Sequence, residues 1–585
     1  MPTLPRGLRT CLAGGLALLV AVATPVVGGV PLQVVVEGVD GEVLENVLGY
    51  LGIEQNRAQE GLTEAQLRLL HRRAGDEIRA ALEPFGLYRA RVETALERLP
   101  DGGWIARYTI DPGEAVRLGS VEIVLQGDAA DDPAFAARLD QLPIEEGVPL
   151  RHADYDRARD ALRRLAAERG YLDARFTRRE LGVDLDAYVA HVHLVLDAGR
   201  RYRFGSVRFD QQVLDEALLR RFLPFAEGDP YHSGKLVELQ NSLTASNYFG
   251  QVRVVPQTEA PVDGAIPVEV TLTPRKPQKY TFSVGYGTDT GARGRVNWEW
   301  RPANRRGHSV GAGVELAEQR KIGLVRYGIP MHDPRNERLD LTASLSEETS
   351  DSSFSRVKKL GGAWQLGDDR FRYILSLNFK REESETGGEE VDADLVVPGI
   401  GATYIHADNK LRVGNGFRLE ADFHGGSETL GSDVSFGQFG LVGKHIFTPW
   451  SDLRLIGRWE LGTTWTDDFD SLPVSERFYA GGDESIRGYP WRSLGPVNDA
   501  GEVIGGPHIA VGSLEIERYF TEAWGAALFV DAGNAFDESL DKVYVGAGVG
   551  VRWRTPIGGI RVDVAHGLDD EQGGWRLHLQ LGPDL

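Results

Sequence analysis

Cysteine is almost missing from this chain of 585 residues. The single cysteine, Cys11, falls within residues 1–23, which contain two arginines, an apolar run from Leu12 to Ala23 and no acidic residue. These features are typical of a secretory signal peptide, with cleavage near Gly28 and an uncleaved anchor as alternatives. We therefore expect an exported mature chain without disulfides, whose stability comes from burial or from a closed sheet.

Long apolar runs are also missing after residue 24. No stretch reaches the roughly 18 apolar residues of a membrane helix, which excludes a helical membrane protein but not a transmembrane β-barrel, whose strands alternate. Basic residues are not in excess, because 65 lysines and arginines face 86 aspartates and glutamates, and the formal charge is −21. We therefore expect no nucleic-acid partner.

Catalytic and metal-binding motifs are absent from the sequence. It contains no H-E-x-x-H, no P-loop and no EF-hand spacing, and its 13 histidines are scattered without ligand spacing. The stretch "GHSVG" (Gly307–Gly311) matches the nucleophile elbow of hydrolases, which requires a helix after the serine. Alternating "AGVELAE" follows instead, so we interpret this stretch as a turn before a strand. The sequence thus predicts no catalytic residue, no metal site and no cofactor, and we expect that the protein is not an enzyme.

Residues 30–275 contain a repeated unit of about 80 residues. A helix is predicted from Thr63 to Leu82, because Thr63 and Gln66 have capping-box spacing and Leu67, Leu70, Ala74 and Ile78 share one face. "DPGEAVRLGSVEI" (111–123) matches "DAGRRYRFGSVRF" (197–209), so chance self-similarity is the weaker alternative. Each unit reads strand, helix, helix, glycine turn, strand, strand, and the units are predicted at residues 30–113, 114–200 and 201–275.

Residues 276–585 have only the period of a β-strand. "YTFSVGYG" (280–287) and "WRLHLQL" (575–581) alternate apolar and polar residues, and sixteen such segments occur. A soluble sandwich and an outer-membrane barrel both alternate in this way. Strand length, strand number and the predicted export favour a sixteen-stranded antiparallel transmembrane barrel, the form in which all backbone groups are paired in lipid.

One stretch of the barrel region, residues 466–506, lacks the strand pattern and contains "GGDESIRGYP" (481–490). Together with the signal, the repeats and the sixteen strands, it resembles the outer-membrane assembly and secretion proteins that carry POTRA domains before a barrel. "GGDESIRGY" is similar to the V/I-R-G-F/Y motif of that family, which lies on a long extracellular loop folded into the barrel. The residues that carry this motif are Gly481, Gly482, Ser485, Ile486, Arg487, Gly488 and Tyr489.

Two later stretches resemble strand motifs of the same family. "SLEIERYF" (513–520) places Glu515, and "FVDAGNAF" (529–536) places Asp531, where the family has an inward acid; Phe529 and Gly533 belong to the second motif. The resemblance implies that the Arg487 guanidinium reaches Glu515 or Asp531 on the barrel wall, since its planar fork binds carboxylates bidentately. The alternative is a solvated loop.

Three POTRA-like units, "GYGTDTG" (285–291) and the tail "LGPDL" (581–585) resemble the TamA-type branch, the outer-membrane subunits of translocation and assembly modules. This resemblance implies an outer-membrane location, periplasmic POTRA domains, a TamB-type inner-membrane-anchored partner and contact with outer-membrane lipids. It also implies ATP-independent insertion, folding or secretion of client proteins such as autotransporters, by β-augmentation on POTRA domains and through a lateral seam. The expected seam residues are Tyr280, Phe282, Val284, Gly285, Tyr286, Trp575, Leu577, Leu579 and Leu581. A two-partner-type secretion pore for an adhesin and a structural or lipid-conduit barrel are the alternatives.

Overall fold

The structure is a computed structural model that describes residues 31–57, 62–100, 102–287, 291–368, 370–409, 412–555, 558–568 and 574–582. The predicted signal peptide and the tail residue Leu585 lie outside these ranges, as do the side chains of Gly285, Tyr286 and Leu581. The chain divides into two compact units. One comprises residues 1–205, 227–234 and 258–266, and the other comprises residues 206–226, 235–257 and 267–585.

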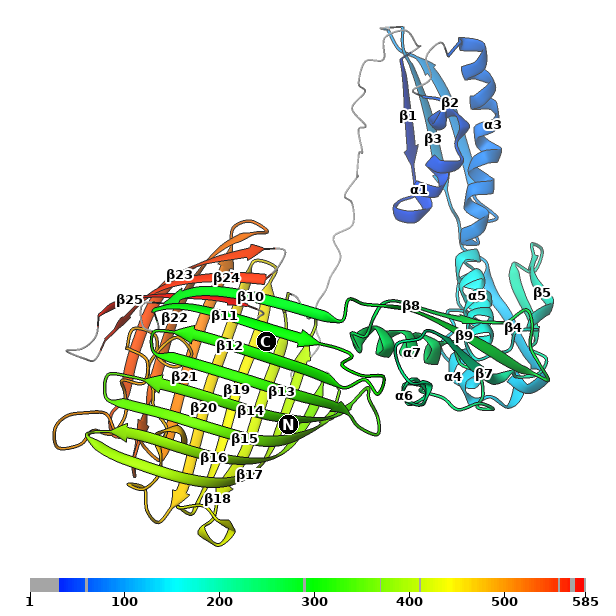
Figure 1. Ribbon diagram of the computed structural model, residues 1–585. Helices are drawn as coiled ribbons and strands as arrows, with labels where there is room; N and C mark the ends of the chain where they lie inside the picture. The colour runs from blue at the N-terminus through cyan, green and yellow to red at the C-terminus, as the bar shows by residue number, and fades with distance from the viewer. Residues whose placement is uncertain are drawn as a thin grey trace, which may run out of the picture. The chain divides into compact units, whose positions relative to one another are not determined.

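Three small sheets with helices make up the N-terminal part of the chain (Figure 1). Their strand orders are β1-β3-β2, β4-β6-β5 and β7-β9-β8, so the last strand of each unit lies in the middle. In the first two sheets the middle strand pairs parallel with the first strand and antiparallel with the second. None of the helices in the described part of the chain is long and apolar enough to cross a membrane.

The elements of the three units follow the predicted order, with one additional short helix, α2, in the first. The first unit contains β1 (Leu32–Glu37), α1 (Gly41–Tyr50), α2 (Gly52–Gln55), α3 (Glu64–Leu82), η1 (Glu83–Phe85), β2 (Arg91–Arg98) and β3 (Trp104–Asp111). The second contains β4 (Arg117–Gln126), η2 (Gly127–Asp131), α4 (Pro133–Leu139), α5 (His152–Glu168), β5 (Arg175–Asp184) and β6 (Val189–Asp197). The third contains β7 (Arg203–Asp210), α6 (Glu216–Arg220), α7 (Ser233–Ala245), β8 (Phe249–Pro256) and β9 (Ala265–Pro274).

Helix α3 begins with the capping box that the sequence predicts. The Gln66 backbone N–H donates to Thr63 Oγ1 at 3.3 Å, and the Thr63 N–H donates to Gln66 Oε1 at 2.9 Å. Two of the first-turn N–H groups that have no partner within the helix are thereby satisfied. Leu67, Ala74 and Ile78 are buried on the predicted face and form the core of the first unit with the sheet, while Leu70 is partly buried against it.

The C-terminal part is a single antiparallel sheet of sixteen strands in sequence order, closed into a barrel (Figure 1). The predicted fold class is confirmed. The strands are β10 (Gln278–Gly287), β11 (Gly291–Trp300), β12 (Ser309–Ala317), β13 (Arg320–Pro330), β14 (Glu337–Thr349), β15 (Ser353–Gly367), β16 (Phe371–Thr386), β17 (Glu389–Ala407), β18 (Gly416–Gly426), β19 (Phe436–Trp450), β20 (Leu453–Thr466), β21 (His508–Tyr519), β22 (Trp524–Phe536), β23 (Tyr544–Thr555), β24 (Gly558–Gly567) and β25 (Trp575–Gly582). Two short 3₁₀ turns, η3 (Glu428–Leu430) and η4 (Val474–Glu476), lie in the connections.

The polarity of the barrel is inverted relative to a soluble sheet protein. On β22, Leu528 is 61% exposed on the outer face, whereas Asp531 is fully buried on the inner face. The same holds on β23, where Val549 is exposed and Arg552 is buried. A soluble sandwich would bury the apolar face, so the sandwich alternative is wrong, and the outer face has the composition of a lipid-facing surface.

The stretch "GHSVG" lies at the start of β12. Gly307 has a φ of +76°, and the strand begins two residues later at Ser309. No helix follows the serine, so the interpretation of this stretch as a turn before a strand is confirmed.

Candidate functional site

The connection between β20 and β21, residues 467–507, folds into the barrel. Leu472, Ile486 and Tyr489 in this loop are buried, and they pack in two separate clusters against wall residues such as Leu395 and Val511. Backbone bridges between Phe478 and Gly506 and between Ala480 and Leu494 keep the loop compact. The loop therefore occupies part of the lumen as a packed element.

The tip of the loop touches the wall at positions where at least one side is glycine. Gly488 has a φ of +97°, and a Cβ there would lie 2.6 Å from the backbone nitrogen of Gly567 on β24. A Cβ at Gly546 of β23 would lie 1.9 Å from the backbone oxygen of Arg487. Gly481 and Gly482 also have positive φ, which side chains other than hydrogen rarely allow. These glycines let the backbone of the tip lie directly on the wall.

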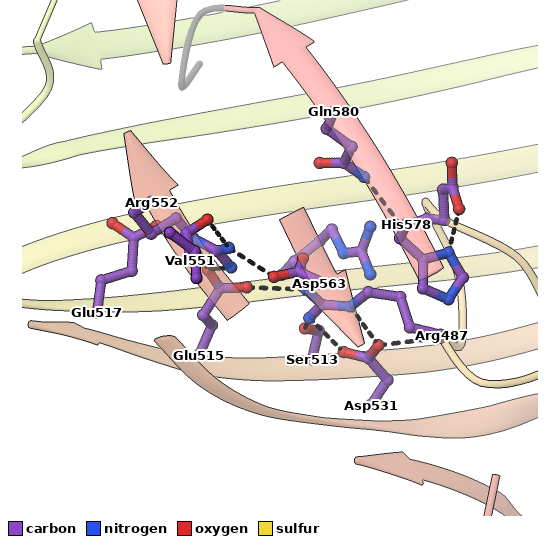
Figure 2. Close-up of polar contacts among 12 residues, drawn as sticks. Arg487, Ser513, Glu515, Glu517, Asp531, Val551, Arg552, Asp563, His578 and Gln580 are labelled. Atoms are coloured by element: carbon purple, nitrogen blue, oxygen red, sulfur yellow. Dashed lines mark hydrogen bonds and ion pairs between the residues drawn. The ribbon is translucent and has the colours of Figure 1, made fainter. Parts of the chain in front are cut away.

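Arg487 is held by three carboxylates of the inner wall (Figure 2). Its Nε and Nη2 donate to the two carboxylate oxygens of Asp531 on β22, at 2.8 and 3.0 Å, and its Nη1 donates to Glu515 on β21 and Asp563 on β24, both at 3.0 Å. The backbone N–H of Arg487 also donates to Asp531, at 3.0 Å. The structure thus brings Arg487 together with both predicted partners and adds a third, Asp563.

The ring of Phe529 completes the Arg487 pocket. The guanidinium carbon lies 3.4 Å from the ring centroid, close enough for a cation–π contact, and only 5% of Arg487 is exposed. Burial alone would lower the pKa of the Arg487 guanidinium, but Asp531, Glu515 and Asp563 raise it above its ordinary value. Gly533, four residues after Phe529, has a φ of +152°, and a Cβ there would lie 2.2 Å from the backbone oxygen of Ala510.

The carboxylates around Arg487 belong to a larger charged network on the inner wall. Arg552 on β23 pairs with Glu515, Glu517 and Asp563, and Arg454 on β20 pairs with Glu517 at 2.6 Å. These ion pairs join four carboxylates to three guanidinium groups. Arg487 is therefore part of an ion-pair network that extends over the wall beyond the loop.

A second contact holds the loop at a different part of the wall. Glu476 in η4 is buried and pairs with Lys380 on β16 and, at 3.1 Å, with His424 Nε2 on β18. Next to it, the backbone N–H of Ser475 donates to Glu382 of β16 at 2.9 Å. Burial alone would raise the pKa of Glu476, but Lys380 and His424 lower it to about 2.

Comparison with known proteins shows which families the chain is similar to. Residues 303–583 match the model described as the Omp85 superfamily domain. Residues 33–112 match the model "POTRA domain TamA domain 1", and residues 202–275 match the POTRA model "Surface antigen variable number repeat". The protein is an outer-membrane β-barrel, similar to the Omp85 superfamily domain, with POTRA domains in the periplasm.

Two curated relatives are named "Outer membrane protein assembly factor BamA". The one from Nitratidesulfovibrio vulgaris is 26% identical over 413 residues, which cover 64% of this chain and 50% of the relative, so the chain matches half of that protein's length. The one from Neorickettsia risticii is 24% identical over 525 residues, covering 83% of this chain and 68% of the relative. Among solved structures, BamA from Haemophilus ducreyi lacking POTRA domains 1–3 has a TM-score of 0.66 at 16% identity, over 80% of this chain and 100% of that one. This likeness shows a shared fold.

The two terminal strands of the barrel, β10 and β25, lie beside one another (Figure 1). Phe282 and Val284 on β10 and Trp575 on β25 are among the most exposed large apolar side chains, Tyr280 and Leu577 are also exposed, and Leu579 is half-buried. Exposed apolar side chains at this position face the hydrocarbon of the membrane.

Several residues of the site were not predicted from the sequence. Asp563 sits between Val562 and Val564 in an alternating strand, and this signal could have found it as an inward residue. Arg552 and His578 also lie between apolar residues of alternating strands, but alternation does not show which residues they contact. Glu476 lies in the loop and has no such signal. Within the described residues, no group of three or more histidine, cysteine, aspartate or glutamate side chains is arranged to hold a metal ion.

Proposed function

We propose that the protein is a TamA-type assembly factor that inserts, folds or helps secrete other outer-membrane proteins, autotransporters among them. The observation that carries this proposal is the loop anchored inside the barrel, where Arg487 is buried among Asp531, Glu515 and Asp563. A lumen occupied by an anchored loop is a poor route for a long polypeptide. A client would instead enter the membrane at the seam between β10 and β25.

The seam is suited to this role because its strands are short and lie at the two ends of the sheet order. Strand β10 has 10 residues and β25 has 8, whereas β16 and β17 have 16 and 19. A shorter ladder contains fewer hydrogen bonds and separates more easily. When the strands part, their free N–H and C=O groups would pair with the strands of a client.

The POTRA sheets provide the second element of the proposal. Strands β2, β5 and β8 lie at the edges of their sheets, where an extended segment of an unfolded client would add by β-augmentation. The periplasmic side would also receive a TamB-type partner anchored in the inner membrane. The mechanism uses binding energy and membrane strain, with no catalytic step and no nucleotide.

A reversible seam lock tests the route. One cysteine would replace Thr281 or Ser283 on β10 and the other would replace Arg576 on β25, since neighbouring antiparallel strands bring opposed α-carbons to roughly 4.5–5.5 Å, within disulfide reach. His578 and Gln580 are less suitable positions because both contact the loop. We expect the oxidised protein to lose client assembly and a reductant to restore it.

The matched control is a disulfide within a ladder away from the seam, at the opposed residues Val551 of β23 and Val562 of β24. That variant should assemble clients whether oxidised or reduced. Full client assembly by a quantitatively locked seam would contradict the proposed route and would favour the lumen, as in a secretion pore for an adhesin.

A further inference from the structure

The in-folded loop makes a second kind of contact, with the last strand of the barrel. The carboxylate of Asp483, four residues before Arg487, pairs with Nδ1 of His578 on β25. Gln580 of the same strand donates from Nε2 to the backbone oxygen of Asp483 at 3.2 Å. The N–H of Gly488 donates to His578 Nε2 at 3.4 Å. Three contacts therefore connect one turn of the loop to β25.

The chemistry of His578 fits this position closely. A neutral imidazole with its proton on Nδ1 donates to Asp483 and keeps a lone pair on Nε2 that accepts from Gly488, so one tautomer satisfies both contacts. His578 is fully buried, and the side chain of Asp483 is 14% exposed. A buried contact of this kind is more sensitive to truncation than an ion pair on the surface.

The contact lies directly beside the Arg487 cluster. In the ladder between β24 and β25, His578 is opposite Asp563, and Asp563 accepts from Nη1 of Arg487. The loop thus contacts β24 through Arg487 and β25 through Asp483. Strand β25 is the end of the sheet order, and it pairs with β24. The contact with Asp483 therefore adds an attachment on the luminal side of the strand.

We propose that Asp483 and His578 are positioning residues that connect the loop to the seam, so that β25 is held in place while the loop is anchored and is freed when the loop leaves. This inference rests on the proposed function, because release of β25 matters only if clients enter the membrane at the seam. In this arrangement the loop controls the opening of the seam in addition to filling the lumen. A client that displaces the loop would release β25 at the same time.

Hydrogen exchange on the purified full chain in detergent tests this inference without a client. The variants are Asp483→Ala, His578→Ala and the double variant, and exchange is followed at the amides of the β24–β25 ladder. Each single variant should speed exchange there by about tenfold, the loss expected for one buried hydrogen bond to a charged group. The double variant should be no faster than His578→Ala, because that variant has already lost the contact with Asp483.

Two further variants separate this contact from a general loss of structure. Asp483→Asn keeps an acceptor oxygen for His578 Nδ1 and should retain most of the protection. Glu484→Ala removes the adjacent exposed acid and should leave the ladder unchanged. In all five of these variants, the protease protection of the loop should persist, because Arg487 still holds it.

Unchanged exchange at β24–β25 in both Asp483→Ala and His578→Ala would overturn the inference, as would effects that add in the double variant. This outcome is distinct from failure of the proposed function, which is measured by client assembly with the seam locked. If His578→Ala does not fold, hydrogen exchange at β24–β25 in Asp483→Ala alone tests the inference, because that substitution changes only the loop.

Discussion

At the scale of the residue, the contacts of Arg487 at the loop tip depend on the shape of its side chain as well as on its charge. Arg487 makes a bidentate contact with Asp531 and single contacts with Glu515 and Asp563, while its planar face lies on Phe529. A lysine ammonium is compact and has no fork to reach three carboxylates on three strands. The side chain therefore determines which strands the loop contacts.

Replacement of Arg487 should release the tip of the loop. Removing one partner of a buried ion pair costs roughly 3–5 kcal/mol in a dry interior, and less in a hydrated lumen. We expect Arg487→Ala to make the loop at least about tenfold more sensitive to added protease, with the barrel otherwise assembled, and Arg487→Lys to restore only part of the protection. Limited proteolysis of the purified protein measures this, and equal cleavage rates in wild type and Arg487→Ala would show that the arginine does not hold the loop.

Glu476 predicts a dependence on acid pH at the other anchor. A carboxylate whose pKa is lowered on folding stabilises the folded form at pH values above its unfolded pKa, and this contribution disappears as the pH falls through the folded pKa. For Glu476 the pKa falls from 4.5 to about 2, so its anchor should weaken progressively between these two pH values. A fluorophore on a cysteine that replaces the exposed Ser471 would report the release.

The matched variants are Glu476→Gln and Glu484→Gln. Glu476→Gln should have a released signal at neutral pH already and no transition between pH 4.5 and 2, because the titrating carboxylate is gone. Glu484→Gln changes an exposed acid of the same loop and should behave as wild type. A transition that persists in Glu476→Gln would assign the acid sensitivity to another group.

At the scale of the element, local chemistry decides where helices and strands begin. The capping box at Thr63 starts α3, and the alternation of polar and apolar residues produces the strands of the barrel. In both cases the signal lies within a few residues of the element. Such elements are predictable from one sequence.

The cap of α3 predicts a measurable loss in the first POTRA unit. Thr63→Ala removes the side-chain oxygen that accepts from Gln66 N–H and should destabilise this helix by about 1 kcal/mol. Hydrogen exchange at the α3 amides of the full chain should then be about fivefold faster. Thr63→Ser keeps the hydroxyl and should retain wild-type exchange, and equal exchange in the alanine variant would show that the cap contributes nothing.

At the scale of the whole molecule, the barrel and the POTRA sheets are built by different means. The POTRA units bury apolar cores between helices and sheets, as in the cluster of Leu67, Ile78 and Tyr108. The barrel instead holds charged residues inside and apolar residues outside. Its stability depends on a membrane or detergent around it.

This difference predicts that residues 276–585 fold alone in detergent. Each barrel strand pairs with its sequence neighbour, so the sheet requires no strand from the POTRA domains. Unboiled protein should migrate faster on a gel than boiled protein, and its circular dichroism should be that of a β protein. Identical migration with and without boiling, or strong helical dichroism, would contradict both the predicted domain boundary and independent folding.

Only part of the candidate site could be predicted from the sequence. The family motif pointed to Arg487, Glu515 and Asp531, and the structure brings these three residues together. Asp563, Arg552 and the pair of Asp483 with His578 join positions that are up to 95 residues apart. Contacts over such distances depend on strand register and on how the loop enters the barrel, and neither leaves a local pattern.

The sequence by itself determined the elements, their order and the polarity of each strand, because these follow from side-chain periodicity within single segments. Its resemblance to a family motif also pointed to Arg487 and to Glu515 or Asp531 as its partner. Only the tertiary structure decided that the acids of three strands converge on this arginine, that Glu476 holds a second part of the loop, and that Asp483 holds the last strand. The physical reason is that closure of sixteen strands places residues from distant segments around one lumen, where charge balance and burial act on all of them together.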